Sequence, residues 1–293
     1  MKKVMKIGGA LLSVMLVAGL ITSSCSKSSS SNTNNGKIDP SSIAKADLID
    51  YFNFESNGTD SVTGMTPSQQ NGVTYVTGKR GMAYQGKQGA YLLYDLPAVS
   101  KLSTLKAFTV SMWFYGPNIP SDTVPVPAMF GLNGTNDPAW GNMLMTQDRL
   151  PATSDSLNLK IVFGKAGVPF NLQFVGFPNK AFTQNLWFHL IYTYDNVTSK
   201  FKTYVNGVQL NLPAGTTQRV DGATPSLPLG DLNFVGATQF ALGGWIAQIT
   251  HSTAAGTYMG WFKGMMDELR FYDRALTPSE ATTLFDAEVT QLQ

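Results

Sequence analysis

The chain has 293 residues, of which 43% are hydrophobic and 14% are charged, against roughly 25% charged residues in an average globular domain. With 28 glycines and 15 prolines, this composition predicts a turn-rich all-β protein. Residues 1–24 hold three lysines and no other charge, so the remainder carries 18 Lys and Arg against 19 Asp and Glu. This balance, without a basic cluster, excludes nucleic acid as a partner.

The first 24 residues have the pattern of a signal peptide. Three lysines precede an apolar stretch over 7–21, which is shorter than the roughly 20 residues that a membrane-spanning helix needs. Small residues then lead to Cys25, the only cysteine, so no internal disulfide can form. One interpretation is an ordinary secretory signal, cleaved nearby, with Cys25 incidental. The other rests on a resemblance to the lipobox of bacterial lipoproteins, which implies that Cys25 is lipidated.

We predict lipidation of Cys25, because cysteine is otherwise absent and stands where this processing needs it. The protein would then lie in the cell envelope, in the outer membrane of a Gram-negative bacterium, on its periplasmic or surface side. It would touch the membrane through the lipid anchor only. Residues 25–42 form a low-complexity polar run that predicts a flexible tether, and one folded domain is expected over residues 43–293.

Short apolar strands separated by Gly, Asn and Pro turns follow in chain order. The first are LIDYFNF, AYLLYDL and AFTVSMWFYG, over residues 48–54, 90–96 and 107–116. LNLKIVFG is then expected to pair with NLQFVGF, and LWFHLIYTYD with KFKTYVNGVQL, in which Asn206-Gly207 is a strong tight-turn signal. Several such strands with almost no helix predict a sandwich of two antiparallel sheets. Trp113 and Trp187 lie within these strands and are expected in the core.

Two connections are long for a compact domain, and such loops often carry function. One covers residues 116–156 and contains six prolines and Trp140. The other covers residues 236–261 and contains Trp245, Tyr258 and Trp261.

One helix is predicted near the carboxyl terminus. Thr277 is its N-cap, Pro278 its first helical residue, and Glu280 the reciprocal partner in a capping box. An apolar stripe is expected to lie on the sandwich, formed by Ala281, Leu284, Phe285 and Val289.

Four segments, in order, resemble the laminin-G-like, concanavalin A-like jelly rolls of bacterial surface proteins. They are LIDYFNFESNGTDSVTG, GKRGMAYQGKQGAYLLYD, LWFHLIYTYDNVTSKFKTYVNGVQL and FKGMMDELRFYDRALTPSEATTLF. The resemblance implies a two-sheet antiparallel jelly roll with one concave sheet, adjacent first and last strands and a short closing helix. It also implies binding of glycans or proteins, sometimes with a structural calcium near a sheet edge.

Asp267 has an unexpected place in the closing segment. Read with a period of two, it shares a face with Leu269 and Phe271, which predicts a carboxylate that points toward the core. A calcium ion could bridge Asp267 to Asp60, which lies in a glycine-flanked turn able to offer carbonyl ligands. Alternatively, Asp267 could accept backbone N–H bonds from a neighbouring loop. The sequence leaves both arrangements open.

The acidic residues do not match the retaining glycosidases of this fold. Those enzymes carry two carboxylates about 5 Å apart, in an E-x-D-x-x-E or E-x-D-x-E strand. The four glutamates here fit neither pattern; they are Glu55, Glu268, Glu280 and Glu288. No His or Cys cluster has zinc spacing, and no G-x-S-x-G elbow occurs. We therefore predict a binding protein and not an enzyme.

The aromatic residues of the two long loops are the candidate ligand contacts. Sugar rings present flat C–H faces that pack on aromatic rings, while nearby polar side chains bind the hydroxyls. The predicted contacts are Trp140, Trp245, Tyr258 and Trp261. We predict that the domain binds a glycan without hydrolysing it. The alternative is a protein-interaction, adhesion or structural module of the envelope that uses the same loops.

Overall fold

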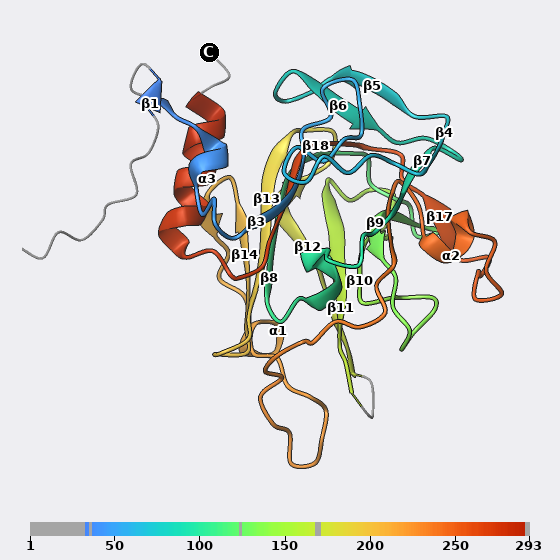
Figure 1. Ribbon diagram of the computed structural model, residues 1–293, viewed down its shortest axis with the longest axis vertical. Helices are drawn as coiled ribbons and strands as arrows, with labels where there is room; N and C mark the ends of the chain where they lie inside the picture. The colour runs from blue at the N-terminus through green and yellow to red at the C-terminus, as the bar shows by residue number, and fades with distance from the viewer. Residues whose placement is uncertain (1–32, 35–36, 123–124, 168–170, 291–293) are drawn as a thin grey trace, which may run out of the picture. The chain divides into compact units, whose positions relative to one another are not determined.

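The computed structural model describes residues 33–34, 37–122, 125–167 and 171–290. In this part of the chain, two eight-stranded sheets stack face to face (Figure 1). Sheet I consists, in spatial order, of β12 (Asn171–Thr183), β11 (Ser156–Lys165), β10 (Met143–Asp148), β9 (Val126–Leu132), β16 (Gln239–Leu242), β7 (Tyr91–Asp95) and β4 (Gln69–Asn71), with β17 (Met259–Trp261) parallel to β9.

Sheet II forms the second layer. Its strands are, in spatial order, β15 (Val208–Gln209), β14 (Lys200–Val205), β13 (Phe188–Asp195), β8 (Phe108–Tyr115), β18 (Met265–Tyr272), β6 (Met82–Gln85) and β5 (Thr74–Thr77), with β3 (Leu48–Phe52) beside β18. A separate pair consists of β1 (Thr33–Asn34) and β2 (Lys37–Ile38). The helices are η1 (Pro40–Ser42), η2 (Lys101–Thr104), α1 (Ala214–Thr217), α2 (Ile246–Ile249) and α3 (Pro278–Thr290).

The architecture confirms the predicted two-sheet antiparallel sandwich with a carboxyl-terminal helix. Both predicted hairpins are present, β11 with β12 and β13 with β14. At the tight turn, Asn206 and Gly207 have φ values of +49° and +75°, as a two-residue hairpin turn with the favoured twist requires. The first long strand, β3, pairs with the last, β18.

Aromatic rings from both sheets interdigitate to form the core. Phe240 of sheet I lies 5.5 Å, between ring centroids, from both Phe52 and Phe271 of sheet II. All three rings are at most 1% exposed. Burial of one such side chain contributes about 1.5–3 kcal/mol, so this aromatic layer is what holds the two sheets together.

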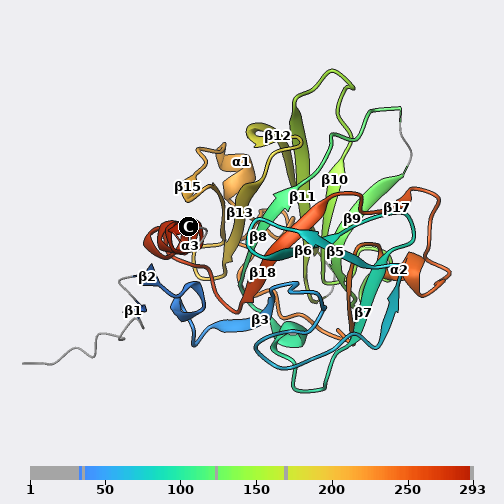
Figure 2. The same ribbon diagram turned by 90° about the horizontal axis from the view of Figure 1, so that it is seen from above.

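The outer face of each sheet is covered by a different helix. Ala281 and Leu284 of α3 pack with Ile191 and Tyr272 on sheet II, whereas Ile249 of α2 packs on sheet I with Leu93 and Ala241. Figures 1 and 2 show α3 and α2 on opposite sides of the sandwich.

Helix α3 begins as predicted but buries a different stripe. Glu280 N–H donates to Thr277 Oγ1 at 3.2 Å, and Thr277 N–H donates to Glu280 Oε2 at 2.8 Å, which completes the capping box. In the last turns of the helix, Ala287 and Glu288 are buried, whereas the predicted residues Phe285 and Val289 are only half-buried. Burial of Glu288 is tolerated because this carboxylate is paired, as described below.

The folded part begins earlier than residue 43. Ile38 packs against the cluster beneath α3, and Pro40 is buried. Residues 37–42 therefore belong to the domain and not to the tether. The predicted signal peptide, residues 1–24, and Cys25 lie outside the described residues, so lipidation stays a prediction. Within the described ranges, no helix combines the length and apolarity needed to cross a membrane.

Candidate functional site

Trp245 is the centre of an aromatic cluster on the outer face of sheet I. It precedes α2, its side chain is 0% exposed, and its Nε1–H donates to the Val126 carbonyl at 2.8 Å. Ala128, Leu144 and Val162 complete its surroundings. A ring buried in this way has no free face for a sugar. The prediction that Trp245 itself touches a ligand is therefore wrong, and the residue supports its neighbours.

The two stretches predicted as long loops are not loops throughout, because they contain β9, β10, β16, α2 and β17. Their remaining connections meet at Trp245. Trp140, from the connection between β9 and β10, packs edge-on against it with a centroid distance of 5.1 Å. Tyr258, which precedes β17, makes a similar contact at 5.5 Å. Trp140 is half-buried and Tyr258 is 39% exposed. Both residues are predicted ligand contacts, and the fold brings them to one place.

Phe174 of β12 belongs to the same cluster, although sequence reasoning did not single it out. Its ring centroid lies 5.1 Å from that of Trp140, and 48% of the residue is exposed. The available signal was the alternation of exposed Phe174, Gly176 and Pro178 along a strand at the edge of sheet I. We call Trp140, Phe174 and Tyr258 the aromatic surface.

Asp137 fixes the aromatic surface and adds a polar group to it. Its Oδ1 accepts the N–H groups of Ala139 and Trp140, both at 2.9 Å, which holds the loop that carries the Trp140 ring. Burial, and then the nearby Asp137 carboxylate, raise the pKa of Tyr258. The Tyr258 hydroxyl therefore stays protonated and able to donate, while Asp137 can accept.

A polar strip continues from the aromatic surface along the same face of sheet I. Lys160 of β11 forms an ion pair with Asp148 of β10, with a distance of 2.5 Å between Nζ and Oδ2. Lys160 lies opposite Gly176 in the ladder, where a Cβ would come within 2.9 Å of the lysine side chain. The missing side chain at Gly176 therefore leaves room for the Lys160 side chain beside β12.

Trp261 lies apart from this cluster. Its ring stacks on Tyr91 with a centroid distance of 6.0 Å and an interplanar angle of 23°. A Cβ at Gly244 would lie 2.8 Å from its ring, so Gly244 allows the close approach of the chain that precedes α2. Trp261 is half-buried and packs with Leu93 and Ile249. Its predicted ligand contact stays a prediction, separate from the aromatic surface.

Asp267 is held by a backbone donor, which confirms one of the two predicted arrangements. The Arg80 N–H donates to Asp267 Oδ2 at 2.7 Å, from the turn between β5 and β6. Gly78 makes room there, since a Cβ would lie 2.6 Å from the same oxygen. Asp267 Oδ1 has no hydrogen-bond partner among the described residues, and burial raises the pKa of this carboxyl to about 8.

The predicted orientation of Asp267 is wrong because β18 contains a bulge. Glu268 has φ of +54°, and the pairing with β8 shifts register between Asp267 and Arg270. Such an extra residue resets the alternation of the strand. Asp267 therefore pairs with Trp113, whose Nε1–H donates to Glu288 of α3, and shares the face that α3 covers.

The donors around Asp60 do not fit a calcium ion. Asp60 Oδ1 accepts N–H groups from Tyr51 at 2.6 Å and Val62 at 3.1 Å. Its Oδ2 accepts from Thr63 N–H at 2.9 Å and from the Thr63 hydroxyl. These four donors occupy the oxygens that a cation would need. In the described part of the chain, no group of three or more His, Cys, Asp or Glu side chains could hold a metal.

Two glutamates lie beneath α3 and are inaccessible. Glu268 and Glu288 are 2% and 0% exposed, and both form ion pairs with Arg270. His189, on the same face, is hydrogen-bonded to Ser111 at 2.8 Å. Burial, and then Arg270, lower the His189 pKa to about 3, so the ring is neutral. This network joins α3 to sheet II and has no opening for a substrate.

The two stacked antiparallel sheets and the carboxyl-terminal helix define a jelly-roll sandwich. The sequence matches the laminin G family described as the concanavalin A-like lectin/glucanases superfamily over residues 87–282, and the chain belongs to this family. No curated protein sequence matches the chain.

Solved structures share the fold at low sequence identity. A botulinum neurotoxin type C structure, described for its interaction with two ganglioside molecules, is 11% identical with a TM-score of 0.56, over 87% of this chain and 53% of that one. The binding domain of Paraclostridial Mosquitocidal Protein 1 is 15% identical with a TM-score of 0.52, over 82% and 52%. The chain thus spans about half the length of these toxin structures. Domain 4 of the arabinanase AbnA from Geobacillus stearothermophilus, in complex with arabinotriose, is 24% identical with a TM-score of 0.47, over 81% and 98%.

Proposed function

We propose that the protein binds a glycan on the aromatic surface, without hydrolysing it. One observation carries the proposal: Trp140, Phe174 and Tyr258 come from three distant segments, gather at one place and keep exposed ring area. A contiguous exposed apolar patch marks an interaction site, and aromatic rings match the flat C–H faces of sugars. Membership of the concanavalin A-like lectin/glucanases superfamily and the ganglioside interaction described for the botulinum neurotoxin support the binding of a glycan.

The polar strip would supply the hydrogen bonds. Asp137 and Asp148 can accept from sugar hydroxyls, and Lys160 and the Tyr258 hydroxyl can donate to them. Aromatic rings at one end and polar groups at the other suit a short stretch of oligosaccharide that lies across β10, β11 and β12. The rings provide most of the affinity, and the polar groups select among sugars.

The test is a glycan array with the purified protein, followed by titration of the best ligand. Trp140→Ala and Phe174→Ala should each weaken binding by about 1–3 kcal/mol, the scale of aromatic stacking on nucleobases. Trp187→Ala is the matched control, because this tryptophan is also half-buried but pairs with Tyr115 outside the aromatic surface. Equal affinity of all three variants would exclude this surface as the glycan site. If no glycan on the array binds, the alternative of a protein-interaction module is favoured.

The absence of hydrolysis has its own test. A retaining glycosidase needs two accessible carboxylates about 5 Å apart, whereas Glu268 and Glu288 are buried and paired with Arg270. The best ligand, incubated with the protein, should release no reducing ends above buffer. Release that a single Asp or Glu substitution abolishes would show an enzyme.

We also propose that the domain works at the cell envelope, held by a lipid on Cys25. The support is the signal-like segment with its single cysteine, which lies in the sequence outside the described residues. An anchored glycan-binding domain would hold polysaccharide, or a glycosylated surface, close to the membrane that carries it.

A further inference from the structure

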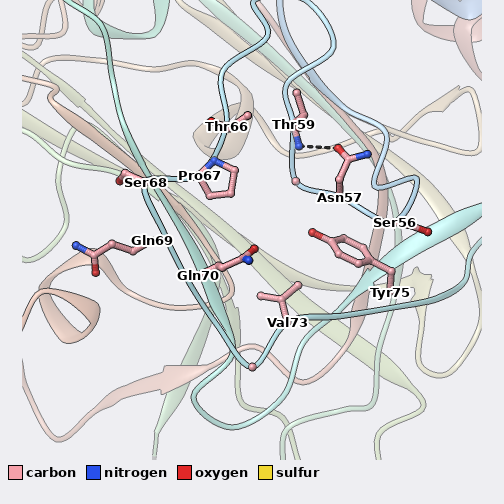
Figure 3. A pocket seen from close by; sticks show the side chains of 12 residues that line it. Ser56, Asn57, Thr59, Thr66, Pro67, Ser68, Gln69, Gln70, Val73 and Tyr75 are labelled. Atoms are coloured by element: carbon pink, nitrogen blue, oxygen red, sulfur yellow. Dashed lines mark hydrogen bonds between the residues drawn. The ribbon is translucent and has the colours of Figure 1, made fainter.

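A polar groove lies at the opposite end of sheet I from β12. It opens at the edge of the sandwich, where the edge strand β4 of sheet I is followed by the edge strand β5 of sheet II. Its volume is about 760 Å³, within the range of small-molecule sites. Figure 3 shows Thr66 to Gln70 on one wall, and Asn57 and Tyr75 on the other.

The lining of this groove carries no charge. It includes no Asp, Glu, Lys, Arg or His; its polar groups are the amides of Asn57, Gln69 and Gln70 and the hydroxyls of Ser, Thr and Tyr75. The lining residues themselves offer no counter-charge to an anionic or cationic ligand. Amides and hydroxyls both donate and accept, which is what a ligand bearing several hydroxyl groups requires. The Tyr75 ring adds an apolar face beside them.

One lining group lacks a partner. The Tyr75 hydroxyl is buried without a hydrogen-bond partner among the described residues, whereas Gln70 is exposed to solvent. In Figure 3 these two groups point toward one another across the hollow. A buried polar group without a partner costs about 1–3 kcal/mol. A ligand hydroxyl that entered between Gln70 and Tyr75 would remove this cost.

The wall opposite Gln70 is held in place before any ligand arrives. Asn57 Oδ1 accepts the Thr59 N–H at 2.8 Å, and the Tyr94 hydroxyl donates to the Gly58 carbonyl at 2.7 Å. A Cβ at Gly58 would lie 2.5 Å from Leu92 Cδ1, so only glycine allows this close approach. Because the wall is fixed, a ligand does not need to order it, which favours binding.

We propose that this groove is a second binding site, which takes a neutral saccharide between Gln70 and Tyr75. The class of ligand, a saccharide, rests on the proposed glycan-binding function. The site itself does not depend on the aromatic surface. The groove selects uncharged sugars because its lining is uncharged. The aromatic surface, beside Asp137 and the ion pair of Lys160 and Asp148, has no such restriction.

The experiment titrates the full chain with cellotriose, xylotriose, maltotriose and arabinotriose as neutral probes, and with sialyllactose as an anionic one. All titrations use the Trp140→Ala background, which removes the aromatic surface as a competing site. At least one neutral probe should bind and sialyllactose should not. Gln70→Ala and Tyr75→Phe should each lower the affinity about tenfold, the loss of one hydrogen bond to the ligand.

Gln88→Ala is the matched control, because Gln88 is an exposed glutamine outside the groove. Tyr75→Phe should not lower the unfolding midpoint and should raise it, since the change removes a buried hydroxyl that has no partner. The proposal is overturned if no neutral probe binds, or if Gln70→Ala and Tyr75→Phe bind as tightly as Gln88→Ala. A different outcome would separate the two proposals. If a neutral probe binds in the groove, but Trp140→Ala and the wild type give the same glycan-array result, the aromatic surface is refuted and the groove is not.

Discussion

Truncation of Trp245 separates the packing of the aromatic cluster from ligand binding. The ring is 0% exposed and makes edge contacts with Trp140 and Tyr258. Truncation of a buried tryptophan to alanine costs about 3–5 kcal/mol. The change also removes the donor to the Val126 carbonyl, so we expect Trp245→Ala near the upper end of this range.

Equilibrium unfolding in urea measures this loss, with the slope checked for a constant two-state transition. Trp245→Phe keeps most of the ring but removes the Nε1 donor to Val126, and should cost about 1–3 kcal/mol. Trp140→Ala removes a half-buried ring at the rim, so its main effect should fall on glycan affinity. Binding is compared at a temperature at which every variant is folded.

Two results would refute the reasoning. An unchanged midpoint for Trp245→Ala would mean that the ring is not packed between the long loops. The same stability loss for Trp140→Ala as for Trp245→Ala, with glycan affinity untouched, would mean that the whole cluster is structural.

Three further predictions follow from the acidic residues and the amino terminus. Burial raises the pKa of Asp267 to about 8. Burial, and then the charge and hydrogen bond of Asp60, raise the pKa of Asp50 to about 8. In the folded protein both carboxyls therefore hold protons that the unfolded chain loses near pH 4. The stability of the fold should therefore fall as the pH rises from about 4 to about 8 and then level off. In thermal melts, Asp50→Asn and Asp267→Asn should each flatten this dependence on pH. The same dependence in wild type and variants would contradict the burial argument. Chelation with EDTA should leave the melting temperature unchanged, because four donors fill the Asp60 carboxylate; a decrease that Asp60→Ala abolishes would reveal calcium. Cys25→Ser should move the protein from the membrane fraction to the soluble one, and its retention in membranes would rule out the lipid anchor.

The sequence by itself determined the features that depend on neighbouring residues in the chain. The turn at Asn206-Gly207 needs two positive φ values, and the cap at Thr277 needs a hydroxyl three residues before Glu280. Alternating apolar strands determined the two-sheet sandwich, because each strand must bury one face. The pairing of β11 with β12 followed from the same local pattern.

Only the tertiary structure decided which aromatic residues face a ligand. Trp245 and Trp140 stand in similar loops in the sequence, yet one is fully buried and the other lies at the rim. Phe174 joined the surface because β12 passes beside the Trp140 loop. Burial depends on which distant segments meet, and the composition of one loop does not contain that information.

The face on which Asp267 lies was also beyond the sequence. A period of two holds only while a strand keeps its register, and the bulge at Glu268 breaks it. Glu288 shows the same limit on α3, where a charged residue occupies a buried position because Arg270 and Trp113 meet it there. The free energy of burying a charge is set by its partners, and these partners are brought together only when the chain folds.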